Sequence, residues 1–243
     1  MISKFEGIII TETPYGDNSK IINVLTREHG MVGVMCSNVK SIKNPLRTKT
    51  LKFTYGYFHL NYNENKLSKL VDVDIIDNFT KMKSDIELIS FMSYITDLTY
   101  QVAKQNDDPV IFELYISTVK KMNEGKNPLI LTNILELKYL EYLGVGLNLE
   151  GCVKCGNKTN IVTLDPDVGG YVCQNCYTNE VILSPKSIKL LRMYYLIEIG
   201  SISDIKIQGS TADEINYFLD KYYERYTGIY LKSKDFLKRI SRL

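Results

Sequence analysis

Four of the five cysteines in this 243-residue chain fall into two C-x-x-C pairs, and their spacing is the strongest chemical signal in the sequence. Cys152 and Cys155 form the first pair, and Cys173 and Cys176 form the second after residues 156–172. This pattern is typical of a zinc ribbon, because Zn²⁺ prefers tetrahedral coordination by thiolate sulfur. A redox dithiol is the alternative. Because four protein ligands leave no open coordination position, we expect one structural zinc ion per chain and no hydrolytic chemistry at the metal.

The residues between the two pairs are suited to bring them together. Residues 161–164 and 171–172 have strand-like composition, and the turn-rich stretch 165–170 separates them. A hairpin of these two strands would place the second cysteine pair beside the first. Gly156 follows the first pair, where a residue without a Cβ relieves crowding around a metal. The fifth cysteine, Cys36, stands alone in an apolar run, and we interpret it as a buried small residue.

No other motif for catalysis is present. The sequence lacks the G-x-S-x-G, Walker A, G-x-G-x-x-G and H-E-x-x-H patterns, and it contains only two histidines, His29 and His59. Asp72, Asp74 and Asp77 lie close enough in sequence to suggest a magnesium site, but a solvated strand face is the simpler interpretation. We therefore predict that the protein is not an enzyme.

The composition is that of a folded protein without a membrane span. Hydrophobic residues make up 44% of the chain and charged residues 24%, close to the average for globular domains. The longest unbroken apolar run, residues 193–197, is far shorter than the roughly 20 residues of a membrane helix. The first residues contain no apolar leader. We expect a cytoplasmic protein with no membrane contact.

The first 80 residues have the pattern of short strands separated by turns. Apolar and β-branched runs indicate strands at residues 7–11, 21–26, 31–36, 53–60 and 69–76. Five short strands favour a small barrel or a sandwich. The OB-fold, a five-stranded barrel that binds oligonucleotides, is one such architecture, but periodicity does not separate it from the others.

After residue 80 the hydrophobic period becomes helical. Helices are predicted near residues 86–102, 109–122, 128–143, 185–199 and 211–226. Capping boxes at 84–87 and 211–214 and a proline after Asp108, Asn127 and Ser184 mark their starts. The predicted class is α+β, with one domain at residues 1–80, a helical domain at 81–243, and a zinc module at 151–180 inserted in the helical part.

Positive charge is concentrated in two segments. Residues 29–63 contain five basic and no acidic residues, a net charge of +5, and residues 221–243 contain seven basic and two acidic residues, again +5. Such segments attract phosphate backbones, although a lysine-rich solvated surface is the simpler interpretation.

The order of these motifs resembles the RecO family of bacterial recombination mediators and DNA-repair proteins. The similarity rests on residues 7–10, 13–17 and 25–30, on the basic stretch with residues 51–54, and on a four-cysteine motif that follows residues 139–144. It covers essentially the whole chain. The resemblance implies an N-terminal OB-fold, a helical body and an embedded zinc module that is structural, because not every member carries it.

The resemblance also implies a non-catalytic activity: binding of single- and double-stranded DNA, annealing of complementary strands, and assistance to a recombinase in displacing single-strand-binding protein. It implies action on the nucleoid. The expected partners are DNA, RecR and the acidic, apolar C-terminal tail of single-strand-binding protein. A zinc-stabilised protein-interaction scaffold that binds no nucleic acid is the alternative function.

Two sets of residues are assigned on this basis. The barrel face and its loops should contact DNA through nine residues: Lys20, Arg27, Lys40, Lys43, Arg47, Lys49, Lys52, Tyr55 and Tyr57. Phe53, Tyr55 and Tyr57 are interpreted either as stacking platforms for bases or as barrel core. An apolar groove with a basic rim should hold the tail, with the rim formed by Lys121, Lys186, Lys189 and Arg192.

Overall fold

The computed structural model describes residues 2–202, 205 and 207–241. The chain divides into two compact units, residues 1–89 with 96–116 and residues 90–95 with 117–243. Helices α3 (Ile86–Ala103) and α4 (Pro109–Asn123) contribute residues to both units. The domain limits expected from the sequence stay predictions, because compact units defined by packing do not have to coincide with them.

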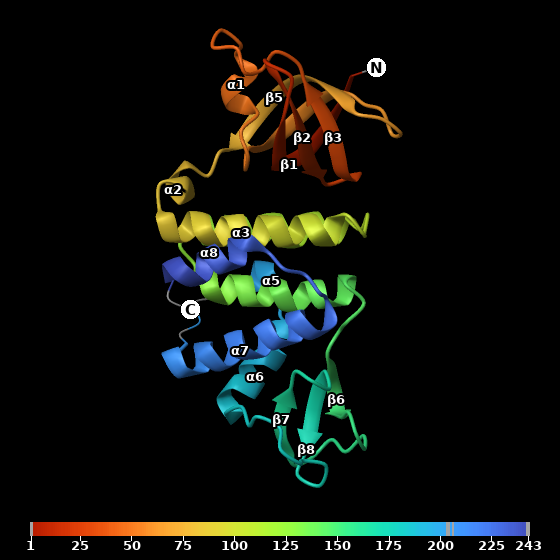
Figure 1. The fold of residues 1–243 in the computed structure, drawn as a ribbon, viewed down its shortest axis with the longest axis vertical. Helices are drawn as coiled ribbons and strands as arrows, with labels where there is room; N and C mark the ends of the chain where they lie inside the picture. The colour runs from red at the N-terminus through yellow and green to blue at the C-terminus, as the bar shows by residue number, and fades with distance from the viewer. Residues whose placement is uncertain (1, 203–204, 206, 242–243) are drawn as a thin grey trace. The chain divides into compact units, whose positions relative to one another are not determined.

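The first unit contains a closed five-stranded barrel (Figure 1). Its strands are β1 (Ile2–Tyr15), β2 (Ser19–Thr26), β3 (Gly30–Cys36), β4 (Tyr55–Asn61) and β5 (Ser68–Asp77). The strand order is β1-β2-β3-β5-β4, with β3 and β5 parallel and the other neighbours antiparallel. The prediction of an N-terminal OB-type barrel is confirmed.

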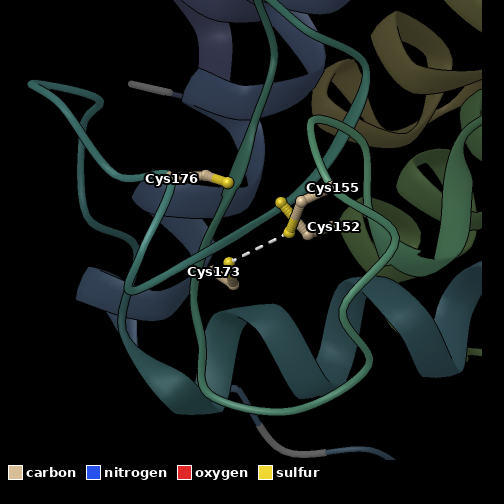
Figure 2. Close-up of side chains that lie close together, drawn as sticks. All are labelled: Cys152, Cys155, Cys173 and Cys176. Carbon is tan, nitrogen blue, oxygen red and sulfur yellow. Dashed lines mark hydrogen bonds between the residues drawn. The ribbon is translucent and has the colours of Figure 1, made fainter.

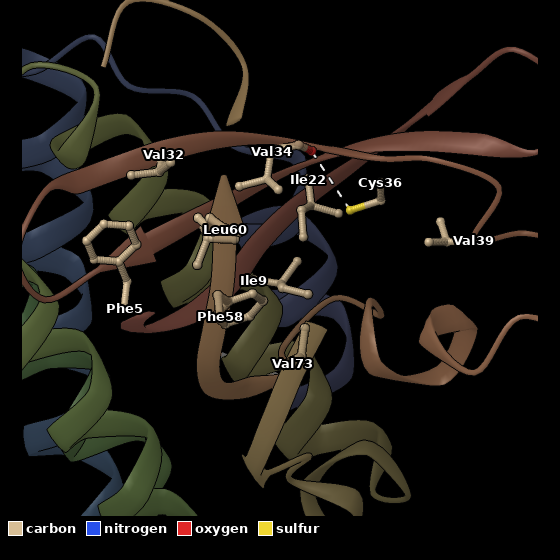
Figure 3. Packing of buried hydrophobic residues seen from close by; sticks show 11 residues of the cluster. Phe5, Ile9, Ile22, Val32, Val34, Cys36, Val39, Phe58, Leu60 and Val73 are labelled. Atoms are coloured by element: carbon tan, nitrogen blue, oxygen red, sulfur yellow. Dashed lines mark hydrogen bonds between the residues drawn. The ribbon is translucent and has the colours of Figure 1, made fainter. Parts of the chain in front are cut away.

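The barrel interior is filled by alternate side chains of the strands, because successive residues of a strand point to opposite faces. Ile9, Ile22, Val34 and Phe58 are completely buried and converge there (Figure 3). Cys36 lies in the same cluster, which confirms its interpretation as a core residue. Burial raises the pKa of the Cys36 thiol to about 12, so this cysteine is not a reactive thiolate.

The second half is helical, as predicted. The five predicted helices correspond to α3, α4, α5 (Pro128–Tyr142), α6 (Pro185–Leu196) and α7 (Gly209–Tyr226). α5 is buried on nearly all sides and packs against α6 and α7. The sequence did not predict α1 (Leu46–Lys49), α2 (Thr80–Lys83), the 3-10 turn Ile199–Ser201 or α8 (Lys232–Ser241). None of the described helices combines the length and apolar character that a membrane crossing requires.

Both predicted capping boxes are wrong, although the helices exist. Asp85, not Ser84, caps α3 by accepting hydrogen bonds from the backbone N–H groups of Glu87 (2.8 Å) and Leu88 (3.1 Å). Ser84 is instead the C-cap of the short helix α2. Helix α7 begins at Gly209, so Thr211 lies inside it and is buried. Ser84 therefore ends the preceding helix and Thr211 lies inside its own helix, so neither residue is an N-cap.

A small sheet carries the cysteine motif in the second unit. Its strands are β6 (Asn148–Cys152), β7 (Ile161–Asp165) and β8 (Gly170–Cys173), in the order β6-β8-β7. Strands β7 and β8 form the predicted antiparallel hairpin. Strand β6, which the sequence did not predict, pairs with β8 in parallel.

Candidate metal centre and nucleic-acid interface

The hairpin brings the four cysteines of the two pairs into one cluster. Their Sγ atoms all lie within 4.8 Å of one another (Figure 2), and the sulfurs of Cys155 and Cys173 are 3.6 Å apart. A Zn–S distance of about 2.3 Å in a tetrahedral site places ligand sulfurs about 3.8 Å apart. The cluster therefore has the size and the donor set of a four-cysteine metal centre, and these residues could hold a metal ion.

The backbone around the first pair is shaped for such a site. Gly156 donates its N–H to the carbonyl of Cys152 at 2.7 Å, and Cys152 donates to the carbonyl of Asn157 at 2.8 Å. Gly156 adopts a φ of 76°, in the left-handed region that glycine tolerates best. A Cβ on Gly151 would lie 2.8 Å from the Gly156 carbonyl oxygen, so the strand that precedes Cys152 also requires a glycine.

The thiols of the cluster differ in their tendency to ionise. Burial opposes ionisation of Cys152, but hydrogen bonds from the backbone of Cys173, Lys154 and Cys155 outweigh it and lower the pKa of Cys152 to about 6. Hydrogen bonding to Cys155 and burial raise the pKa of Cys176 to about 12. Four neighbouring thiolates repel one another, and a divalent cation is the charge that would compensate them.

A salt bridge fastens the two cysteine pairs to each other. Lys154, between the cysteines of the first pair, donates from Nζ to the carbonyl of Cys176 at 3.1 Å and forms an ion pair with Glu180. Glu180 also accepts the backbone N–H of Thr178 at 2.7 Å. Through these contacts Lys154 and Glu180 hold the segment that follows the second cysteine pair against the first pair.

The basic loop between β3 and β4 packs on the β1–β2 hairpin. Lys40 donates its backbone N–H to the carbonyl of Asn18 at 2.9 Å, and its Nζ lies 3.3 Å from the carbonyl oxygen of Gly16. Lys43 and Arg47 are exposed, and among the described residues their side chains make no ion pair or hydrogen bond. Lys40 and Arg47 line a pocket of about 490 Å³ whose walls also include Leu51.

Three other predicted DNA contacts are engaged by carboxylates. Lys20 is only 9% exposed and its Nζ lies 2.6 Å from Glu12. Lys49 pairs with Asp72 at 2.8 Å, and Lys52 pairs with Asp97 at 3.2 Å. The acidic partners come from outside residues 29–63, so the charge of +5 counted for that segment overstates its free positive charge. Lys20 in particular is a buried ion-pair residue.

Arg27 has a structural position within the first unit. Its guanidinium forms two hydrogen bonds with Glu6, at 2.9 and 3.2 Å, and an ion pair with Glu113. The guanidinium carbon also lies 5.0 Å from the centre of the Phe112 ring. The hydrogen bond with Glu6 raises the pKa of Arg27. This side chain links the end of strand β2 to strand β1 and helix α4, and two carboxylates already compensate its charge.

The structure places the three candidate aromatic residues differently. Phe53 is 7% and Tyr55 2% exposed, and the Tyr55 hydroxyl donates to Glu6. Neither ring has an open face, so the assignment of Tyr55 as a stacking platform is corrected to a buried residue. Tyr57 is 37% exposed, and the Nζ of Lys4 lies 4.3 Å from its ring centre. Tyr57 alone of the three reaches the surface.

Two of the four predicted rim residues lie on a groove. Lys189 and Arg192, on α6, line a groove of about 500 Å³ together with Lys158 of the cysteine module, which sequence reasoning missed. Lys186 is exposed on the same helix but does not line this groove, and neither does Lys121, whose Nζ pairs with Glu124 at 3.1 Å. The only signal for Lys158 is its position three residues after Cys155.

Comparisons with known proteins cover both halves of the chain. The family model for the N-terminal part of recombination protein O matches residues 1–79, and the model for its C-terminal part matches residues 83–235. A DNA repair protein RecO from Bacillus pumilus (strain SAFR-032) is 32% identical over 247 residues, covering 100% of this chain and 96% of the relative. Proteins of the same name from Listeria monocytogenes serotype 4b (strain CLIP80459) and Bacillus subtilis (strain 168) are 31% and 29% identical, each covering 96% of the relative and 99% and 100% of this chain.

Proposed function

This chain belongs to the RecO family of DNA repair and recombination proteins, and from that premise we propose that it binds DNA and anneals complementary strands. In this proposal it also assists a recombinase in loading onto single strands that are covered by single-strand-binding protein. It acts in the cytoplasm, on the nucleoid, without catalysing a covalent reaction.

The observation that carries the proposal is the basic loop on the barrel. Lys43 and Arg47 are exposed cations without an acidic partner in the described chain, and Lys40 lies beside them. Cations in this state can neutralise phosphates and release counterions, which provides affinity without reading the sequence of bases. Annealing requires two like-charged strands to be held close together, and a basic surface lowers the repulsion between them.

The proposed partners are RecR and the tail of single-strand-binding protein. The cluster of Cys152, Cys155, Cys173 and Cys176 is proposed to hold one structural zinc ion, because its donor set and spacing fit this metal. An acidic and apolar tail fits a groove with basic residues at its rim, and Lys189 and Arg192 are the two predicted rim residues that line one.

An annealing assay with a matched control tests the proposal. Replacing Lys40, Lys43 and Arg47 by alanine should slow annealing of complementary strands about tenfold at low salt, since three phosphate contacts are lost. The control removes three charges elsewhere, at Lys66, Lys69 and Lys81, which are exposed. We expect the control to anneal at the parent rate. Equal rates for both variants would exclude the loop as the contact surface.

Failure of the parent protein to bind DNA or to accelerate annealing would overturn the proposal itself. The groove beside α6 would then favour the alternative function, a zinc-stabilised scaffold for protein partners.

A further inference from the structure

The groove that Lys189 and Arg192 line is built from two different parts of the second unit. One wall comes from helix α6, through Lys189, Arg192 and Ile188. The other wall comes from the cysteine module and includes Lys158, Ile161 and Tyr171. The groove therefore exists only where the module and the helix are held at their present positions.

The charge and the surface of the groove indicate the chemistry of its occupant. Lys158, Lys189 and Arg192 bring three positive charges against the single negative charge of Glu150. Within the described chain none of these three cations has an ion pair or a side-chain hydrogen bond. Ile161 and Ile188 are half-buried and provide apolar surface between the charges. A ligand that combines carboxylates with a bulky apolar side chain complements both features.

The module wall is directly connected to the cysteine cluster. Lys158 follows Cys155 by three residues, and Ile161 pairs in register with Cys173 across the β7–β8 ladder. Gly151, which also lines the groove, precedes Cys152 and packs against the carbonyl of Gly156. A metal ion that fixes the four sulfurs would consequently fix this wall, because ligand binding in such modules supplies the folding energy.

We infer that metal binding at the four cysteines and binding of an acidic, apolar peptide in the groove are linked, each favouring the other. The inference rests on the proposed function for the class of partner, and it adds the site and its dependence on the metal. Linkage is reciprocal, so the peptide should also slow loss of the metal. DNA would also be attracted to three cations, so competition by single-stranded DNA is one arm of the test below.

The first test measures peptide affinity with charge variants. The probe is a fluorescein-labelled peptide of four aspartates followed by leucine and phenylalanine, with a free C-terminal carboxylate, titrated at low salt into full-length protein. Lys189→Ala combined with Arg192→Ala should weaken binding about tenfold or more, since both are charge-assisted contacts. Lys186→Ala, on the same helix but outside the groove, should change it less than twofold. Equal affinities for the two variants, or tighter competition by single-stranded DNA than by unlabelled peptide, would overturn the inference.

The second test removes the metal. Chelation of the purified protein should reduce peptide affinity about tenfold or more, and added Zn²⁺ should restore it, whereas DNA affinity measured on the same samples should not change. Unchanged peptide affinity after verified metal loss would refute the linkage. If chelation unfolds the helices, the rate of zinc release from the intact protein decides instead, because excess peptide should slow that release and an unchanged rate would refute the linkage. Retained DNA affinity without peptide binding would refute this inference and the proposed tail partner, and would leave the proposed DNA binding and annealing intact.

Discussion

Removing the positive charge of Lys234 should lower the free energy of unfolding more than any other single charge change in the second unit. Lys234 Nζ lies 2.9 Å from Glu136 Oε1 and 2.8 Å from Asp220 Oδ1. Glu136 is 3% exposed at its side chain, and it also accepts a hydrogen bond from the hydroxyl of Tyr94. Lys234→Met would therefore leave the buried carboxylate of Glu136 without a compensating charge and would leave Asp220 with Lys238 as its remaining cation.

Breaking a buried ion pair from one side lowers the free energy of unfolding by about 3–5 kcal/mol. We expect the lower end, about 3 kcal/mol, because Asp220 is 31% exposed and keeps its pair with Lys238 at 2.5 Å. In a chain of this length that loss corresponds to a fall in melting temperature of about 6–12 °C. Lys238→Ala, one turn further along α8, is the matched control and should cost at most about 1 kcal/mol.

Thermal unfolding followed by circular dichroism provides the comparison. A second replacement, Glu136→Gln, should recover part of the loss in the Lys234→Met background, because it removes the uncompensated buried charge. If Lys234→Met destabilised the protein no more than Lys238→Ala, the reasoning about burial of this charge cluster would be refuted.

Three further outcomes are expected. Burial opposes ionisation of Asp220, but the charge of Lys234 outweighs it and lowers the pKa of Asp220 below 3.8. The stability that the Asp220–Lys234 pair contributes is complete above pH 3.8 and is lost as the pH falls through the lowered pKa. The Lys234→Met variant lacks this contribution, so its acid unfolding should begin at a higher pH than that of the parent. Arg27→Ala should cost about 1–2 kcal/mol by removing the two charged hydrogen bonds that Glu6 accepts from the guanidinium. The same variant should leave the salt dependence of DNA binding unchanged, and thermal unfolding and a salt titration check the two outcomes. Elemental analysis under reducing conditions should find one zinc per chain, and Cys155→Ser should lower that content while the helical circular dichroism persists; an absence of zinc in the parent would contradict the assignment.

The elements that the sequence predicted are those whose patterns repeat. Strand β3 alternates buried and partly exposed residues along its whole length, and α3 carries an apolar stripe over five turns, so each has a period that can be counted. Helix α8 escaped prediction because Leu237 is its one buried hydrophobic residue among those described, and ion pairs from Lys234 and Lys238 hold it. Strand β6 is short and contains a glycine, which weakens its signal.

The two candidate sites differ in how far sequence could predict them. Two C-x-x-C pairs at this spacing define which residues can coordinate one metal ion, so the sequence alone predicts all four members of the cluster. The basic surface has no such constraint. The partner of Lys49 lies 23 residues away and that of Lys52 lies 45 residues away, and only the folded barrel brings them together. Charge counted along the chain therefore could not distinguish Arg47, which has no partner among the described residues, from the cations that carboxylates already hold.

In the proposed function, DNA is held by the exposed cations of the loop between β3 and β4. The most direct test is the dependence of DNA affinity on salt for the parent and for a Lys43→Ala, Arg47→Ala variant. If each cation neutralises one phosphate, the slope of log K against log salt should become less steep by about 1.4 for single strands and about 1.8 for duplex DNA, equally for unrelated sequences. An unchanged slope together with unchanged affinity would contradict the claim, as would a parent protein that does not bind DNA at low salt.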